Sequence, residues 1–205
     1  MITKFKVSRK IFIPSLLCGL LCAVFLSFSS FNASCEDLRQ NVLRLHIVAN
    51  SDNVKDQQLK LKIRDEILSQ SGNIFEKSVD VEDALATAQK KVKLFEEIAN
   101  EVIKKEGFDY KASAKIGDSY FETRSYEDFT LPAGVYKSLI IELGKAKGKN
   151  WWCVIFPEVC IPTASKVGLD KTVNANGCQI AENSNRYIMR FKAVELYEDI
   201  KKFFK

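Results

Sequence analysis

The chain has 205 residues, of which 46% are hydrophobic and 28% are charged, and its formal net charge is +5. This length is enough for one domain with a substantial core, and the composition is that of a globular rather than a disordered protein. All four basic residues of the first 34 precede position 11, and residues 35–205 carry 27 basic against 26 acidic residues. The excess charge therefore belongs to the N-terminal segment, and the sequence does not support a nucleic-acid partner.

The N-terminal segment predicts export from the cytoplasm. The basic stretch MITKFKVSRK is followed by the apolar stretch IFIPSLLCGLLCAVFLSFSSF. Its densest part, residues 16–28, suits a signal peptide better than a full membrane span, which needs roughly 20 apolar residues. The exit SFNASC resembles both a peptidase site and a lipoprotein box at Cys35. We therefore expect residues 1–34 to be a signal peptide or an N-terminal membrane anchor, and residues 35–205 to form an extracytoplasmic domain that is membrane-associated at least transiently.

A strand and a helix are predicted first in this domain. Residues 42–49 alternate between an apolar face and a mixed face, and the mixed face carries His46, the chain's only histidine. A helix is expected at about residues 53–70, and Gly72 and Asn73 are expected to end it. The polar residues between the strand and the helix suit a helix N-terminus: Ser51 or Asn53 as the N-cap, and Asp52 and Asp56 near the positive end of the dipole.

The next helix is predicted over residues 81–105, because apolar residues recur there at spacings of three and four. Its lysine-rich end and Gly107 are typical of a helix C-terminus. This helix and the one before it are the two long helices that we expect to cover the sheet.

Short strands are predicted after the second helix, followed by a loop and a last helix. The segments VYKSLIIEL and WWCVIF flank GKAKGKN, which has the composition of a hairpin loop. Residues 163–184 predict a loop, and residues 193–204 an amphipathic helix. The predicted fold class is therefore α+β, with an antiparallel or mixed sheet packed against two long helices and a C-terminal amphipathic helix. The strands are expected at 111–117, 120–129, 135–143 and 151–156.

The cysteines allow two interpretations. In an oxidising compartment we expect a disulfide between Cys153 and Cys160, which leaves Cys178 as the odd thiol or as a partner for Cys35. Alternatively, Cys153 could pair with His46 as the nucleophile and base of a thiol hydrolase, which requires an exposed thiolate. The sequence has neither a CxxC pair nor a His/Cys cluster at zinc spacing, so we expect no metal and no cofactor.

Polar and aromatic side chains supply candidates for binding a partner. Asp56, Lys60 and Arg64 recur at intervals of four, which is typical of a solvated helix face with favourable ion-pair spacing. Trp151 and Trp152 lie on opposite faces of their strand, and an exposed tryptophan beside a tyrosine would be a credible binding anchor.

Two long segments resemble the two signature regions of the stage II sporulation protein R (SpoIIR) family. They are LRLHIVANSDNVKDQQLKLKIRDEIL, residues 43–68, and LPAGVYKSLIIELGKAKGKNWWCVIFPEVC, residues 131–160. The resemblance implies a signalling protein, not an enzyme, that is exported from the forespore into the space between the forespore and mother-cell membranes. It implies that the partner is the membrane-embedded mother-cell protease SpoIIGA, which then processes the sigma-E precursor. The residues that we expect to bind this partner are His46, Asn50, Asp52, Asp56, Lys60, Arg64, Tyr136 and Trp152.

Two rival functions remain open at this level. One is an exported cysteine hydrolase that acts on cell-wall peptide through Cys153 and His46. The other is an anchored structural protein of the septum, which would be favoured if the leader were retained and no protease responded. The resemblance implies no catalytic residue in this chain. It is weaker beyond residue 160, where Cys178 and the last helix lie.

Overall fold

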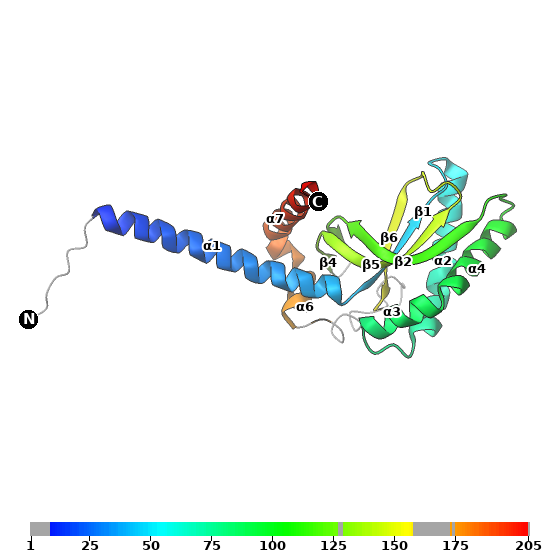
Figure 1. The fold of residues 1–205 in the computed structure, drawn as a ribbon, viewed down its shortest axis with the longest axis horizontal. Helices are drawn as coiled ribbons and strands as arrows, with labels where there is room; N and C mark the ends of the chain where they lie inside the picture. The colour runs from blue at the N-terminus through cyan, green and yellow to red at the C-terminus, as the bar shows by residue number, and fades with distance from the viewer. Residues whose placement is uncertain (1–8, 127–128, 158–172, 174, 205) are drawn as a thin grey trace, which may run out of the picture.

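A mixed β-sheet with helices on both faces forms the centre of the domain (Figure 1). The computed structural model describes residues 9–126, 129–157, 173 and 175–204. The helices are α1 (Arg9–Gln40), α2 (Val54–Phe75), α3 (Val81–Lys90), α4 (Val92–Lys105), α6 (Ala175–Glu182) and α7 (Ser184–Phe203). The strands are β1 (Leu43–Val48), β2 (Ala112–Phe121), β3 (Arg124–Ser125), β4 (Thr130–Leu131), β5 (Gly134–Leu143) and β6 (Asn150–Phe156).

The main sheet has four strands in the order β2-β5-β1-β6. Strand β1 runs parallel to β5 and antiparallel to β6, and β2 is antiparallel to β5. A separate antiparallel pair is formed by β3 and β4. The predicted α+β class with a mixed sheet and a C-terminal helix is therefore confirmed.

The hairpin predicted between β5 and β6 is wrong. Strand β1 lies between these two strands, so the connection at residues 144–149 must pass over the end of β1. The central place of β1 follows from its sequence, because Leu45 and Ile47 on one face and Arg44 on the other are all fully buried. Burial on both faces is typical of a strand in the interior of a sheet that is covered on both sides. We call residues 144–149 the crossover loop.

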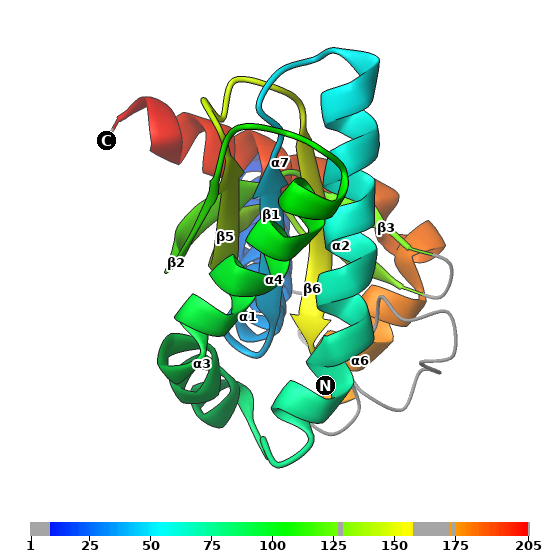
Figure 2. The same cartoon turned by 90° about the vertical axis from the view of Figure 1, so that its right-hand side faces the viewer.

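Helices α2, α3 and α4 cover one face of the sheet (Figure 2). Asn53 is the N-cap of α2, as expected, and its side chain accepts a hydrogen bond from the backbone N–H of Asp56 at 2.8 Å. The helix does not end near Gly72 but continues to Phe75, which is buried in the main core. The expected second long helix is divided at Lys91, whose φ of −105° and ψ of 12° separate α3 from α4.

The opposite face is covered by the end of α1, the β3–β4 pair and α6. Leu38, Val42, Phe121 and Tyr136 belong to the core cluster on this side. Part of the segment predicted as a loop, residues 163–184, forms α6 and its connection to α7, because Ile180 and Ala181 are buried there. The rest of that segment, apart from residue 173, lies outside the described residues.

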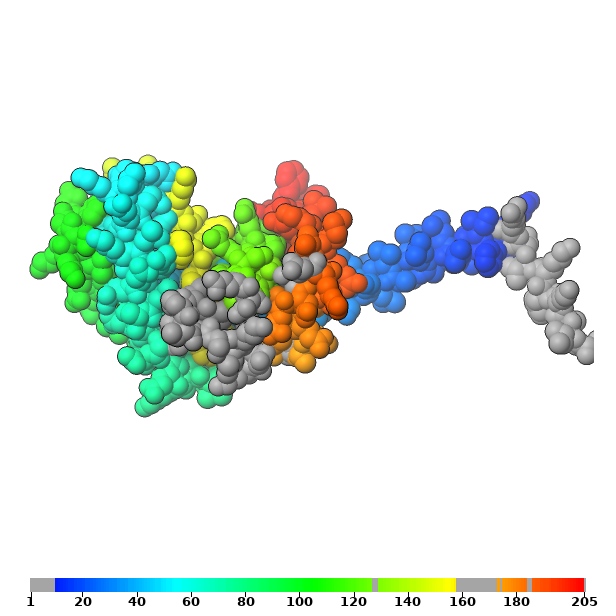
Figure 3. Space-filling model, turned by 180° about the vertical axis from the view of Figure 1, so that it is seen from behind, coloured from blue at the N-terminus to red at the C-terminus, as the bar shows by residue number. Residues whose placement is uncertain are grey.

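Helix α1 projects from the domain at its N-terminal end and enters the core at its C-terminal end (Figures 1 and 3). Residues Lys10–Gln40 are long and apolar enough to cross a membrane, with a hydropathy of 2.4, a property that anchors and signal sequences share. The helix is continuous across the predicted boundary at residues 34 and 35. Phe31 and Cys35, on the two sides of this boundary, are both buried. The choice between signal peptide and anchor stays a prediction.

Candidate functional site

The two sequence motifs meet at the C-terminal end of β1, where the crossover loop lies against residues 49–53. Backbone N–H groups of the loop donate to this polar turn, and an ammonium group of α2 donates back to the loop. Five hydrogen bonds make the connection: Gly148 N to Ala49 O at 2.8 Å, Lys147 N to Asn50 O at 3.2 Å, Lys145 N to Asn50 Oδ1 at 2.9 Å, Lys149 N to Asp52 Oδ1 at 2.6 Å, and Lys60 Nζ to Lys149 O at 2.9 Å. The polar residues that follow β1 therefore hold the loop that passes over it.

The carboxylate of Asp56 organises this turn. Its Oδ2 accepts hydrogen bonds from Asn50 Nδ2 at 2.8 Å, Ser51 Oγ at 2.5 Å and Asn53 Nδ2 at 3.1 Å. Its Oδ1 accepts from the hydroxyl of Tyr110 at 2.7 Å. Asp56 is buried, so these donors replace the water that a charged carboxylate would otherwise need.

The hydrogen bonds also set the protonation of the cluster. Burial by itself raises the pKa of Asp56, but the donors from Ser51, Tyr110, Asn50 and Asn53 outweigh it and leave the pKa below its ordinary value. The pKa of Tyr110 is raised by burial and by its bond to Asp56. Asp56 is therefore an ionised carboxylate with both oxygens occupied. This arrangement stabilises the turn before α2.

The expectation of an exposed Asp56–Lys60–Arg64 face is wrong for its first two members. Lys60 is 4% exposed, and its ammonium donates to the Lys149 carbonyl and to Gln57 Oε1 at 2.7 Å. Burial lowers the pKa of Lys60. The physical reason is the crossover loop, which covers this side of α2. Arg64 is partly exposed, and its guanidinium stacks over the Trp151 ring at 4.4 Å.

His46 is a hydrogen-bonded residue of the sheet. Its Nε2 lies 3.0 Å from Asn150 Oδ1, and its Nδ1 lies 3.3 Å from Ser119 Oγ. The imidazole packs edge-on against Phe121 and Trp152. Burial lowers the pKa of His46, and the hydrogen bond to Asn150 opposes this only in part. The imidazole is therefore neutral at pH 7.

The structure does not bring His46 and Cys153 together. His46 lies opposite Trp152, whereas Cys153 lies opposite Leu45. Neighbouring residues of a strand point to opposite faces, so the thiol and the imidazole are on different sides of the sheet. Cys153 is also buried and disulfide-bonded. The geometry of a thiol hydrolase is absent at this pair.

The predicted cysteine pairings are tested only in part. Cys160 lies outside the described residues, so its pairing with Cys153 stays a prediction. Cys35 is a buried thiol without a disulfide, and the alternative pairing of Cys35 with Cys178 is therefore not formed. The Cys178 thiol donates to the carbonyl of Val173 at 3.6 Å.

Of the other predicted partner-binding residues, only some reach the surface. Tyr136, which we expect to bind the partner, is only 1% exposed, and its hydroxyl donates to the Pro132 carbonyl at 2.5 Å, so its side chain does not reach the surface. Trp152 and Asn50 are half-buried, and Asp52 is exposed. Their role in binding a partner stays a prediction.

Sequence reasoning missed the role of Arg44, which is fully buried. Its guanidinium lies 3.9 Å from the centre of the Phe121 ring and 4.9 Å from that of Tyr136, and it donates to the Tyr126 hydroxyl at 2.7 Å. Burial lowers the pKa of Arg44. An arginine on the mixed face of a central strand was the available signal, because a cation there needs aromatic faces or acceptors. Within the described residues, no group of His, Cys, Asp and Glu could hold a metal ion.

Comparison with known proteins agrees with this arrangement of motifs. The family model for stage II sporulation protein R matches residues 39–166, a region that contains β1, the Asp56 turn and the crossover loop. Stage II sporulation protein R of Bacillus subtilis (strain 168) is 32% identical over 158 residues, which are 77% of this chain and 66% of that protein. The chain thus spans slightly less than two thirds of the length of that relative. No solved structure matches it. The chain belongs to the stage II sporulation protein R family.

Proposed function

We propose that this chain is an exported sporulation signal that activates the mother-cell membrane protease SpoIIGA and so causes processing of the sigma-E precursor. The family match across both motifs carries the proposal, because it covers the turn and the loop that fold together at one end of the sheet. The signal would act in the space between the forespore and mother-cell membranes, with α1 as its leader or anchor.

Activation by contact is supported by the chemistry of the polar residues. Both oxygens of Asp56 are held by internal donors, and His46 and Cys153 lie on opposite faces of the sheet. Each of these groups is used to hold the fold rather than to move a proton. A domain of this kind can present a surface of fixed shape to a partner.

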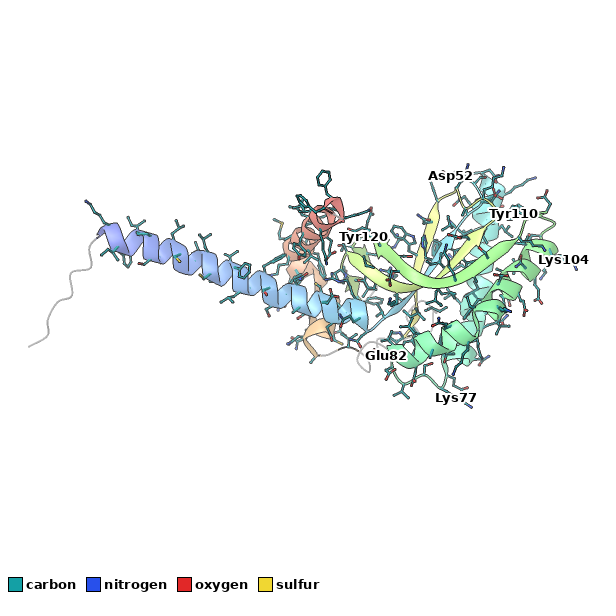
Figure 4. All side chains as sticks on the ribbon, in the orientation of Figure 1. Asp52, Lys77, Glu82, Lys104, Tyr110 and Tyr120 are labelled. Carbon is teal, nitrogen blue, oxygen red and sulfur yellow. The ribbon has the colours of Figure 1, made fainter. Side chains whose placement is uncertain are left out.

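The crossover loop is the docking surface that this proposal favours. Lys145, Lys147 and Lys149 are exposed, and only their backbone groups are used to hold the loop. Figure 4 labels the neighbouring Asp52, which lies in the part of the domain away from the free end of α1, with Lys104 of α4 farther still. If α1 marks the side of the forespore membrane, the loop faces the opposite membrane, which holds the protease.

Reversing charge on this loop is expected to reduce activation without unfolding the domain. Lys145→Glu with Lys147→Glu should lower precursor cleavage at least about tenfold, because like-charge contacts at an interface cost several kcal/mol. The melting temperature should stay nearly unchanged, since exposed ion pairs contribute little to stability. Lys91→Glu with Lys93→Glu changes two exposed lysines at the start of α4 and is the matched control. Equal activation by both double variants would remove the crossover loop from the docking surface.

The function itself can be tested in a host that does not sporulate. The full chain is produced together with the protease and the sigma precursor, and cleavage of the precursor is measured by immunoblot. We expect cleavage when all three are present and none when the chain is omitted. A chain that is exported correctly but causes no cleavage would contradict the proposed function.

A further inference from the structure

Helix α7 has an exposed apolar side opposite the side that packs on the protein. Phe191 and Val194 face the core and are almost fully buried. On the other side, four apolar residues at spacings of seven, four and three form one stripe along the helix. They are Met189, Leu196, Ile200 and Phe203, with exposed fractions of 82%, 62%, 49% and 85%. We call these four residues the α7 stripe.

The position of α7 relates this stripe to α1. Figures 1 and 2 both show α7 lying across α1 at a steep angle. The Phe31 ring packs against Phe191 at 5.4 Å and against Tyr187 at 5.6 Å, and Phe28 packs against Tyr197 at 6.1 Å. The contact therefore lies at Phe28 and Phe31, where α1 changes from an exposed to a buried helix.

The part of α1 before this contact has the length of a bilayer core. Apolar side chains from Ile11 to Leu26 are mostly exposed, and no protein element covers them within the described residues. From Lys10 to Phe28 the helix rises about 27 Å, close to the ~30 Å of the hydrocarbon region. A bilayer that covers this segment would have its surface at Phe28 and Phe31, the level at which α7 crosses.

The side of α7 that faces the domain is more polar than the side that faces the apolar segment of α1. On the side of the domain, the Tyr120 hydroxyl of β2 donates to Asp199 at 3.0 Å. On the side of the apolar segment, Tyr197 contacts Phe28, and Ile200 of the stripe is only three residues from Tyr197. Basic residues exceed acidic ones along the helix, which favours contact with anionic headgroups. These basic residues are Arg186, Arg190, Lys192, Lys201 and Lys202.

We propose that α7 lies in the membrane interface beside α1, with the α7 stripe in contact with lipid. The chain would then be held by two elements, a helix that enters the bilayer and a helix that lies along its surface. A lipid surface is the occupant that we infer for the stripe, because it would cover this stripe and the adjoining apolar surface of α1 together. The inference rests on the proposed membrane location of α1.

The test uses the full chain in vesicles of phosphatidylcholine and phosphatidylglycerol that contain a phospholipid with a photoreactive acyl chain. After illumination, lipid adducts are assigned to peptides by mass spectrometry. We expect adducts on α1 and on the peptide that contains Leu196 and Ile200. Labelling of that peptide should exceed labelling around Val79, an exposed apolar residue beside α3, by at least about tenfold.

A pair of variants makes the result specific to the stripe. Leu196→Glu with Ile200→Glu should reduce adducts on α7 at least about fivefold and leave those on α1 unchanged, because buried charge in lipid is costly. Val54→Glu with Val79→Glu makes the same change at two exposed valines elsewhere. It should alter neither the lipid adducts on α7 nor those on α1.

Three outcomes would overturn the inference. Adducts on α1 without adducts on α7 would place the stripe in water or against a protein. Adducts on α7 that persist in the Leu196→Glu, Ile200→Glu variant would mean that the stripe is not the lipid contact. Absence of adducts on α1 would contradict its membrane location, and this result is independent of whether the protease is activated.

Discussion

Asp56→Ala is expected to lower the free energy of unfolding by about 3–4 kcal/mol, because it removes the buried carboxylate that four partly buried hydrogen bonds share. Asn50, Ser51, Asn53 and Tyr110 all donate to this carboxylate. Loss of the turn should also release the crossover loop, which accepts and donates hydrogen bonds at the same place. Urea unfolding of wild type and variant measures the difference.

Asp65→Ala is the matched control for this change. Asp65 lies on the same helix and is exposed, and its ion pair with Arg64 at 2.6 Å contributes little to stability. We expect a loss of less than about 0.5 kcal/mol for the control. Similar losses for the two variants would contradict the organising role of Asp56.

The lowered pKa of Asp56 adds a pH dependence with a definite sign. Because the folded pKa lies below the ordinary value of 3.8, the stabilisation is fully present above the unfolded pKa and is lost as the pH falls through the folded pKa. Asp56→Ala should therefore lose less stability than wild type on acidification through this window. If wild type and Asp56→Ala lose stability equally as the pH falls, the charge of Asp56 has no part in holding the turn.

Gly148→Ala is expected to destabilise the domain by about 2–3 kcal/mol, because a side chain at this point overlaps neighbouring backbone. A Cβ on residue 148 would overlap the Ser51 carbonyl and lie 2.9 Å from the Ala49 Cβ. The N–H of Gly148 donates to the Ala49 carbonyl, so the loop cannot move away without breaking this bond. The variant should also activate the protease more weakly, since it displaces the loop that we propose as the docking surface.

Gly117→Ala in β2 is the control for the loss of a glycine. A Cβ there would meet only the flexible end of the Ile140 side chain at 3.4 Å. Thermal unfolding of the two variants should show a clear loss for residue 148 and a small change for residue 117. If the two variants have the same melting temperature, close packing of the crossover loop on the turn is not the reason that residue 148 is a glycine.

The sequence predicts the local elements well because short-range interactions decide them. The apolar spacing of α2 and the N-cap at Asn53 depend on residues within one or two turns of each other. The alternation of apolar and polar residues along β1 likewise shows which residues share a face. These features predict the α+β class and the polar turn before α2.

Three of the missed features depend on contacts between distant segments. GKAKGKN has the composition of a hairpin loop, and only the insertion of β1 between β5 and β6 makes it a crossover. The spacing of Asp56, Lys60 and Arg64 predicts a solvated face, but this spacing does not reveal that the same loop covers Lys60. The separation of His46 from Cys153 requires the register between β1 and β6, which neither strand encodes by itself.

We propose that this chain activates a membrane protease by contact and cleaves nothing itself. The most direct measurement is precursor cleavage in a host that does not sporulate, with the full chain present and the protease either active or inactivated at its own catalytic residue. We predict cleavage with the active protease and none with the inactivated one. Cleavage that persists with the inactivated protease, or no cleavage with the active one, would contradict the claim.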